Sequence, residues 1–178
     1  MKFKIFRFKK LKSTNNTAIR IIKNSNCDYG MVVCRTQENG RGQYGRQWVS
    51  YNGNLFVSFF FQLENLNISF KQLTRLNCLL VKKLISSYYR KEIVFKKPND
   101  LLIDNKKICG ILQETLNKLD KKFLIVGIGI NLIKSPNIKN YPTTNLYELL
   151  NKKLSKYKVE NKLRKIFEFK LTKLYRMK

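Results

Sequence analysis

A glycine-rich segment at residues 40–46 (GRGQYGR) places two arginines in a backbone that has little steric restriction. Glycine lets the main chain approach a ligand closely, and guanidinium groups such as those of Arg41 and Arg46 form strong, directional hydrogen bonds to carboxylates and phosphates. This combination suits an anionic ligand that has to be covered and later released. The sequence therefore predicts an anion-binding loop within residues 37–54.

The same segment matches the G-x-G-x-x-G pattern of dinucleotide-binding domains. In that fingerprint a helix starts within the glycines, so that its N-terminus faces the pyrophosphate. Here the residues that follow, 46–54 (RQWVSYNGN), are typical of turns and lead into an aromatic strand. A Rossmann domain is therefore disfavoured.

Two further segments have compositions that suit a binding site. Residues 96–100 (KKPND) come at a strand end, where proline holds a turn that projects Asn99 and Asp100, although an ordinary hairpin turn has the same composition. Residues 126–131 (VGIGIN) place two glycines inside a buried strand. Such glycines indicate a bulge, a ligand against the backbone, or a close-packed crossing in the core. Residue types leave these alternatives open.

Histidine is absent, which removes Ser-His and Cys-His nucleophilic catalysis and the most common zinc ligands. The four cysteines, Cys27, Cys34, Cys78 and Cys109, are scattered without metal-ligand spacing, so we interpret them as buried free thiols. Chemistry must then depend on Lys, Arg, Asp, Asn and Gln side chains and on backbone amides.

The elements that must position these segments include both strands and helices. Leu73, Leu76, Leu80 and Leu84 recur at helical spacing, so residues 69–89 are predicted as an amphipathic helix. Strands are predicted at 3–8, 30–35, 55–63, 93–96, 108–115 and 123–130, and further helices at 13–23, 145–153 and 158–175. The pattern predicts an α+β fold with a mixed, largely antiparallel sheet and helices packed on one side.

Length and composition predict one globular domain over residues 1–178. The chain is 43% hydrophobic and 12% aromatic, well above the composition of disordered proteins. No apolar stretch approaches the roughly 20 residues that a membrane helix needs. The N-terminus lacks the apolar centre of a secretory signal, so we expect a cytoplasmic protein without a membrane partner.

The net charge of +26 raises nucleic-acid binding as an alternative function. The charge is spread over the whole chain, however, and is not gathered into one stripe with stacking aromatics. Lys, Asn and Ile are used heavily and all have AT-rich codons, which offers another origin for the basic residues. DNA binding is therefore not expected.

Five segments, taken in order, resemble the signature of bacterial biotin-protein ligases. They are STN at 13–15, GRGQYGRQW at 40–48 with GNL at 53–55, KKPND at 96–100, KICGILQE at 107–114 and GIGIN at 127–131. The resemblance implies the catalytic domain of these enzymes, with the class II synthetase-like fold that biotin and lipoate ligases share. It implies a biotin-[acetyl-CoA-carboxylase] ligase that uses ATP and Mg²⁺ to form biotinyl-5'-AMP and then transfers biotin to a lysine of an acceptor protein.

This chemistry needs positive charge around a reacting phosphoryl group more than it needs a protein nucleophile. The resemblance implies that Lys96, Lys107 and Arg41 are catalytic, and it assigns no residue to the metal. It implies biotin binding by Ser13, Thr14, Asn15, Gln37, Arg41, Gly42, Gln43, Lys107 and Gly110, and ATP binding by Arg46, Trp48, Lys96, Asn99, Asp100 and Asn131.

Two positions depart from the family's pattern. Gln43 stands where the family usually has an arginine that is thought to retain the adenylate, and Lys97 stands where it usually has tryptophan. We therefore expect a looser grip on the adenylate and a less apolar wall beside the turn. Because Ser13 comes so early, no N-terminal helix-turn-helix domain is expected. The residues after Asn131 are predicted as helices, so the C-terminal SH3-like barrel is expected to be absent or remnant.

The resemblance also implies a partner. The expected acceptor is biotin carboxyl carrier protein, a subunit of acetyl-CoA carboxylase, or another biotin-dependent carboxylase, and an acidic acceptor surface would be steered by the basic charge. A monomer and a homodimer are both compatible with the sequence. A lipoate or octanoate ligase of the same superfamily is the nearest alternative, but those enzymes are expected to carry a histidine motif that this chain lacks.

Overall fold

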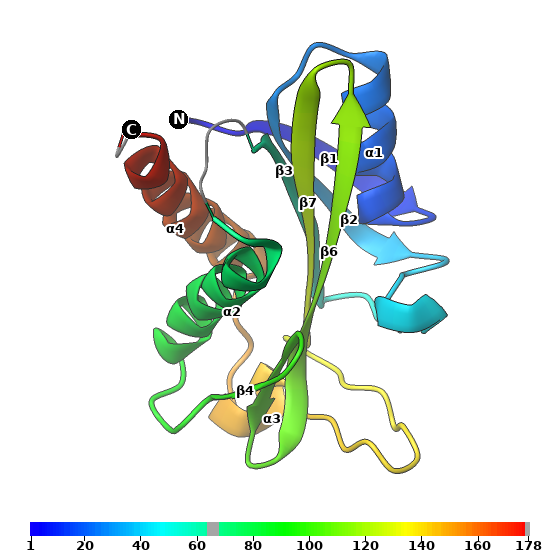
Figure 1. The fold of residues 1–178 in the computed structure, drawn as a ribbon. Coiled ribbons are helices and arrows are strands. Elements are labelled where there is room, and N and C mark those ends of the chain that lie inside the picture. Colours follow the sequence, from blue (N-terminus) through cyan, green and yellow to red (C-terminus); the bar gives the residue numbers. More distant parts are fainter. Residues whose placement is uncertain (64–67, 177–178) are drawn as a thin grey trace.

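The computed structural model describes residues 1–63 and 68–176. In these residues seven strands form one sheet in the order β1-β2-β3-β7-β6-β5-β4, accompanied by four α-helices and one 3-10 turn (Figure 1). The strands are β1 (Lys4–Leu11), β2 (Tyr29–Gln37), β3 (Leu55–Gln62), β4 (Val94–Lys96), β5 (Asp100–Ile103), β6 (Lys106–Lys118) and β7 (Lys121–Ile130). The helices are α1 (Thr14–Asn24), α2 (Phe70–Ser86), α3 (Leu146–Leu150) and α4 (Lys156–Arg176), and the 3-10 turn is η1 (Gln43–Gly45).

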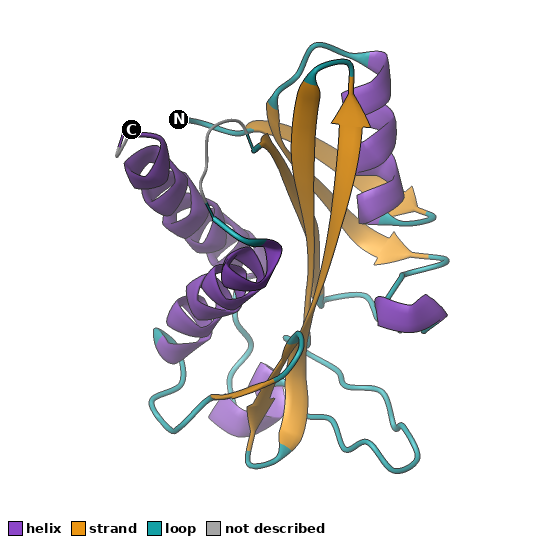
Figure 2. Ribbon diagram, in the orientation of Figure 1, coloured by secondary structure: helices purple, strands orange, loops and turns teal. Residues whose placement is uncertain are grey.

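The sheet is mixed. β1 runs parallel to β2, whereas the other neighbouring strands described pair antiparallel. The long β6–β7 hairpin and the fully buried β3 form its centre (Figure 2). The predicted α+β class and the largely antiparallel sheet are confirmed.

Helices cover both faces of the sheet. α2 and α4 lie side by side on one face, where Phe167 stacks on Phe59 with ring centroids 4.2 Å apart (Figure 1). α1 lies on the other face, where Ala18 and Ile22 pack against Phe60. The one-sided packing expected from sequence therefore holds for α2 and α4. α1 differs because it is the crossover between two parallel strands, and such a connection has to pass over a face of the sheet.

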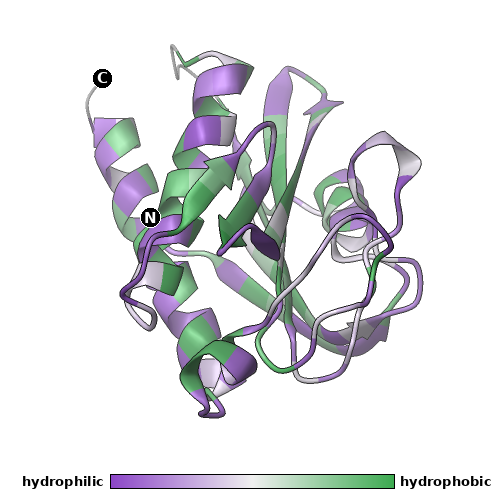
Figure 3. Cartoon of the chain, turned by 90° about the horizontal axis from the view of Figure 1, so that it is seen from below, coloured by the Kyte–Doolittle hydropathy of each residue, from purple (hydrophilic) through white to green (hydrophobic). Residues whose placement is uncertain are grey.

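Hydropathy follows this arrangement. Figure 3 shows hydrophobic strands in the middle of the molecule and helices on which hydrophobic and hydrophilic residues alternate. This is the pattern of helices that bury one face and leave the other in water. Within the described ranges, none of the helices combines the length and hydrophobicity needed to cross a membrane.

Strand β5 is not predicted from the sequence. Its four residues are all buried, and so short an apolar run shows no period that distinguishes a strand from a helix. Lys96 pairs with Asp100 across the β4–β5 hairpin, so residues 97–99 form its turn. The turn at KKPND is thereby confirmed, and the unpredicted strand explains why Asp100 is buried.

The predicted C-terminal helices are confirmed as α3 and α4. α4 lies against the start of the chain, where Glu168 accepts a hydrogen bond from the backbone N–H of Phe3 at 3.0 Å. Thr172 accepts one from the N-terminal amine of Met1 at 2.9 Å. These contacts close the face of the sheet that lies opposite α1.

Candidate functional site

A cavity of about 610 Å³ lies where the start of α1, the glycine-rich loop, the β4–β5 turn and the inner ends of β6 and β7 meet. This volume is within the range of small-molecule binding sites. Every site residue predicted from the sequence belongs to its lining. They are Ser13, Thr14, Asn15, Gln37, Arg41, Gly42, Gln43, Arg46, Trp48, Lys96, Asn99, Asp100, Lys107, Gly110 and Asn131.

The glycine-rich loop folds back on itself. The N–H of Gly42 donates to the carbonyl of Arg46 at 2.7 Å, and the N–H of Trp48 donates to the carbonyl of Gly40 at 2.8 Å. Between these bonds the described chain makes only the three-residue turn η1. No α-helix starts at the glycines of this described loop, so the rejection of a dinucleotide fingerprint is confirmed.

One corner of the cavity is a polar network. Gln37 Oε1 accepts hydrogen bonds from the Thr14 N–H (2.8 Å) and from Thr14 Oγ1 (3.0 Å), and Gln37 Nε2 donates to Ser50 Oγ at 3.1 Å. Because Thr14 donates its hydroxyl proton to Gln37, its lone pairs remain available to accept, and one hydrogen of the Gln37 amide remains available to donate. This corner therefore suits a ligand that presents an N–H and a C=O close together.

Asn15 is buried at the start of α1, and its hydrogen bonds orient its amide. Its Oδ1 accepts from Ser58 Oγ at 2.5 Å, and its Nδ2 donates to Glu114 Oε2 at 2.7 Å. A Cβ atom on Gly127 would lie 2.2 Å from Asn15 Oδ1, so this strand position accepts only glycine. The cap of α1 explains the approach, because Ser13 accepts from the Asn16 N–H and fixes the first turn.

Trp48 occupies a space that two glycines leave open. A Cβ atom would lie 2.5 Å from the indole at Gly110 and 2.4 Å from it at Gly129. The indole Nε1 is buried without a hydrogen-bond partner. The glycines inside β7 are thus explained by close packing of Trp48 and Asn15, and the strand pairs there without a bulge.

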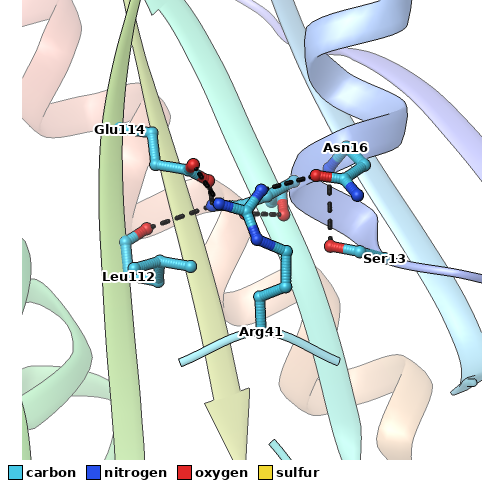
Figure 4. Close-up of polar contacts among 7 residues, drawn as sticks. Ser13, Asn16, Arg41, Leu112 and Glu114 are labelled. Carbon is cyan, nitrogen blue, oxygen red and sulfur yellow. Dashed lines mark hydrogen bonds and ion pairs between the residues drawn. The ribbon is translucent and has the colours of Figure 1, made fainter. Parts of the chain in front are cut away.

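Arg41 is held at the mouth of the loop by two side chains from outside it. Its Nη1 donates to Asn16 Oδ1 at 2.5 Å, and its Nη2 forms a 2.6 Å ion pair with Glu114 Oε1. Figure 4 shows the guanidinium lying between Asn16 on α1 and Glu114 on β6. Although Glu114 belongs to the KICGILQE segment, the sequence reasoning did not select it as a site residue. Its position in that motif could have indicated that it belongs to the site.

Another part of the cavity lining is basic. Lys107 Nζ lies 2.9 Å from Asp100 Oδ1 as an ion pair, although that oxygen has no well-directed hydrogen bond. The Tyr141 hydroxyl donates to Asp100 Oδ2 at 2.6 Å. Lys96 Nζ lies 4.5 Å from the centre of the Tyr141 ring, and Lys107 Nζ lies 5.4 Å from it. Burial, and then the hydrogen bond to Asp100, raise the pKa of the Tyr141 hydroxyl well above its usual value.

Sequence reasoning missed Tyr141. It lies in the irregular segment after β7, which has no helical or strand period. The segment reaches the cavity because Lys107 donates its N–H to the Pro142 carbonyl at 2.9 Å and accepts from the Thr144 N–H at 3.0 Å. No local pattern marks such a contact between residues so far apart in the chain.

The charges of the cavity suit an anion. Among the described residues its lining contains five cationic side chains, Arg41, Arg46, Lys96, Lys97 and Lys107, against the one carboxylate of Asp100. Such an arrangement stabilises phosphate or carboxylate groups.

Two asparagines flank this basic end. Asn99 Nδ2 donates to the Ile111 carbonyl at 2.8 Å, and Asn131 Nδ2 donates to the Thr144 carbonyl at 3.1 Å. Asn131 Oδ1 is buried without a hydrogen-bond partner. A buried, unpaired amide oxygen of this kind is suited to a bound donor or cation.

A metal site built from protein groups alone does not occur in the described part of the chain, which has no cluster of three or more His, Cys, Asp and Glu residues. Burial raises the pKa of Cys34 to about 11 and that of Cys78 to about 12, so these thiols are protonated at neutral pH. The described cysteines are free, and three of the four are buried, which confirms their predicted role as free thiols.

Residues 7–131 match the Biotin/lipoate A/B protein ligase family. The chain is 35% identical over 129 residues to the "Bifunctional ligase/repressor BirA" of Bacillus subtilis, which covers 71% of this chain and 40% of that protein. It is 28% identical over 128 residues to the "Biotin--[acetyl-CoA-carboxylase] ligase" of Paracoccus denitrificans, which covers 70% of this chain and 53% of that protein. The chain thus spans about half or less of the length of these curated relatives.

The structure also resembles solved structures. The biotin protein ligase of Aquifex aeolicus in complex with biotin and ATP superposes with a TM-score of 0.80 and 31% identity, covering 95% of this chain and 70% of that one. The Leishmania major biotin protein ligase in complex with biotinyl-5-AMP superposes with a TM-score of 0.78 over 91% of this chain and 72% of that one. At 22% identity, the second likeness concerns the fold alone.

Proposed function

Because the chain belongs to the Biotin/lipoate A/B protein ligase family, we propose that it is a biotin-protein ligase that activates biotin with ATP and transfers it to a lysine of an acceptor protein. The observation that carries this proposal is the cavity itself. One space is lined by all five motif segments, and its lining combines a polar corner with a basic region. A ligand with a polar ring, an apolar chain and a carboxylate matches these environments.

The polar corner supports recognition of the ureido ring of biotin. Thr14 retains hydroxyl lone pairs for a ring N–H, and Gln37 retains an amide hydrogen for the ring carbonyl. Both partners are already fixed by hydrogen bonds to each other, so little side-chain entropy is lost when the ring binds. The apolar part of the wall, which includes Ile111, Leu112 and Trp48, suits the rest of the molecule.

The basic end supports the first half-reaction. A carboxylate oxygen of biotin attacks the α-phosphorus of ATP, a new C–O–P linkage forms, the bond between the α-phosphorus and the bridging oxygen breaks, and pyrophosphate leaves. Negative charge grows on the phosphoryl oxygens and on the leaving group, so fixed cations lower the barrier. We assign this role to Lys96, Lys107 and Arg41, with Arg46 as a further cation for the nucleotide.

Mg²⁺ is expected to accompany ATP. Mg²⁺ commonly binds through one or two protein oxygens together with phosphate oxygens, and it supplies charge neutralisation to the phosphates. Asp100 and the unpaired Oδ1 of Asn131 are the side-chain oxygens of this region that fit such a partial set. Asp100 is paired with Lys107 and accepts a hydrogen bond from the Tyr141 hydroxyl.

In the second half-reaction the amine of an acceptor lysine attacks the biotinyl carbonyl and AMP leaves. We propose a biotin carboxyl carrier domain of a biotin-dependent carboxylase as the acceptor and the cytoplasm as the compartment. The net charge of +26 favours encounter with an acidic partner surface.

The decisive experiment is ATP-pyrophosphate exchange with Mg²⁺ and biotin, lipoate or octanoate as the acid. Exchange that depends on biotin, and that Lys107→Ala lowers by about two orders of magnitude or more, is the expected result. Lys106→Ala is the matched control, because Lys106 is the exposed neighbour of Lys107 and lies outside the cavity lining. Exchange that depends on lipoate or octanoate would support the other branch of the family, and no exchange with any acid would contradict the proposal.

A further inference from the structure

Glu114 joins two parts of the site that are distant in sequence, although it does not itself line the cavity. Its Oε1 pairs with Arg41 of the glycine-rich loop at 2.6 Å, and its Oε2 accepts from Asn15 at the start of α1 at 2.7 Å. The Glu114 side chain is 22% exposed, so it is shielded from water more than the Arg41 side chain that it holds, which is 41% exposed. One carboxylate therefore ties the loop to the helix that carries the polar corner (Figure 4).

The way in which Arg41 is held leaves it able to bind a ligand. A guanidinium has five N–H donors, and the contacts with Asn16 and Glu114 use one hydrogen on each of its two terminal nitrogens. Three N–H groups remain for an anion. The carboxylate thus fixes the direction of the guanidinium plane without exhausting its donors.

The loop has few other ties. Its first residues are held from outside, because the N–H groups of Glu38 and Asn39 donate to the carbonyls of Leu11 and Lys12. From Gly40 to Trp48, the backbone bonds described join Gly42 to Arg46, Arg46 to Gln43, and Gly40 to Trp48, within the loop itself. For residues 41–47, the hydrogen bonds that the structure describes to the rest of the protein are those of the Arg41 side chain. Tyr44, at the tip, is 86% exposed. Without the pair between Arg41 and Glu114, this part of the loop would depend on its own internal bonds.

We propose that Glu114 is a positioning residue: it holds Arg41, and through Arg41 the glycine-rich loop, over the cavity before any ligand binds. The effect of Glu114 on catalysis rests on the proposed function, in which Arg41 contacts the reacting carboxylate and phosphate. The effect of Glu114 on the position of the loop does not depend on that function and is testable in the ligand-free protein.

The first test is a double-mutant cycle measured by hydrogen exchange of residues 38–50 in the ligand-free full chain. Arg41→Ala and Glu114→Ala should each raise the exchange rates of the loop amides about tenfold, which corresponds to about 1.4 kcal/mol. The double variant should exchange no faster than either single variant, because both remove the same interaction. Rate increases that multiply in the double variant, or unchanged loop exchange in Glu114→Ala, would overturn the proposal.

Glu38→Ala is the matched control. Glu38 adjoins the same loop and pairs with Lys10 at 2.7 Å, with both side chains well exposed. An exposed pair of this kind contributes little, so the control should leave loop exchange within about twofold of the wild-type rate. An equal response in Glu38→Ala and Glu114→Ala would mean that loss of charge alone loosens the loop, which contradicts a specific tie.

A second readout separates positioning from general destabilisation. In the exchange reaction Glu114→Gln should raise the KM for biotin about tenfold while the Tm changes little, because the amide keeps one acceptor oxygen for Asn15 but loses the ion pair with Arg41. A merely structural role would lower the rate in proportion to the folded fraction and leave KM unchanged. If the wild-type protein shows no biotin-dependent exchange, the proposed function fails, whereas the hydrogen-exchange cycle still decides the role of Glu114.

Discussion

Gly129 lies so close to Trp48 that a Cβ atom on this glycine would come 2.4 Å from the indole. Gly129 also pairs with Gly110 across the β6–β7 ladder, so the two missing side chains adjoin and form one slot. The indole fills this slot, and Lys107 Nζ lies 5.2 Å from the centre of its ring. Trp48 is therefore a fixed part of the cavity wall that anchors the C-terminal half of the glycine-rich loop.

Replacing Gly129 with alanine should displace the indole. Overpacking of a filled site costs about 1–3 kcal/mol of unfolding free energy, and here the clash is with a side chain of the cavity. We expect the Tm to fall and the affinity for ATP to weaken. Trp48 is the only tryptophan of the chain, so its fluorescence reports the displacement directly. Lys122→Ala, at an exposed position on the same strand, should change neither signal; unaltered emission in Gly129→Ala would contradict this packing.

Removing the Tyr141 hydroxyl should disturb the basic end of the cavity. Tyr141→Phe keeps the ring beside Lys96 and Lys107 but deprives Asp100 of a 2.6 Å hydrogen bond. Loss of a hydrogen bond to a charged group costs about 1.5–3 kcal/mol, so pyrophosphate exchange should fall by about tenfold or more. Tyr147→Phe, at an exposed tyrosine on α3, is the control. Equal rates in the two variants would exclude a positioning role for the Tyr141 hydroxyl.

The same tyrosine predicts a pH dependence of stability. Its folded-state pKa is raised by burial and by Asp100, whereas tyrosine in an unfolded chain titrates near 10. The contribution to stability is therefore complete below about pH 10 and declines as the pH rises toward the folded-state pKa. Urea denaturation between pH 8 and 11 should show the stability difference between wild type and Tyr141→Phe shrinking above about pH 10. Both proteins contain the neighbouring charged residues Asp100, Lys96, Lys107 and Arg46, so titration of these groups does not distinguish them. A stability difference that stays constant with pH would therefore contradict titration of the Tyr141 hydroxyl as the cause.

Gln43 lines the cavity at the position where a family arginine is expected to retain the adenylate. We predict that Gln43→Arg slows loss of biotinyl-5'-AMP by about tenfold or more, because a charge-assisted hydrogen bond to the phosphate is added. The release rate is measured by rapid gel filtration of the labelled intermediate. Asn39→Arg places the same charge at an exposed position of the same loop, outside the cavity lining, and serves as control. Equally slow release from the wild type and from Gln43→Arg would contradict the prediction that the wild-type protein retains biotinyl-5'-AMP weakly.

Asn54 should be critical for the segment that carries Tyr141. This fully buried side chain accepts from the N–H groups of Leu132 (3.0 Å), Ile133 (2.9 Å) and Lys134 (3.2 Å). Asn54→Ala leaves buried donors unpaired, at about 1–3 kcal/mol each, and should lower the Tm strongly. Asn54→Asp loses the bond from Nδ2 to the Lys134 carbonyl (2.6 Å) but retains an acceptor oxygen for the three N–H groups, so its Tm should fall less. A smaller fall in Tm with alanine than with aspartate would contradict the role of Asn54 as an acceptor for these N–H groups. Asn52→Ala, at an exposed neighbouring position, is the control and should leave the Tm unchanged.

Several features were predictable because they depend on neighbours in the chain. The period of apolar residues in α2, the Ser13 cap of α1 and the turn at 97–99 are all local, and the structure confirms each of them. All the candidate residues except Gln37 lie in the motif segments, and the structure brings all of them to one cavity, whereas their roles in binding and catalysis stay predictions. The turn-like sequence after the glycines is also a local feature, and it already disfavoured a dinucleotide fingerprint.

What the tertiary structure alone decided is which of these residues meet. Arg41 and Glu114 are brought together by the fold of the loop over β6. Tyr141 reaches Asp100 because the irregular segment after β7 forms a backbone bridge to Lys107 of β6. Gly110 of β6 and Gly129 of β7 form one slot for Trp48 only because the strand register sets them opposite each other. The physical reason is that strand register and loop closure depend on the burial of the whole sheet, whereas a sequence pattern reports only the preferences of residues a few positions apart.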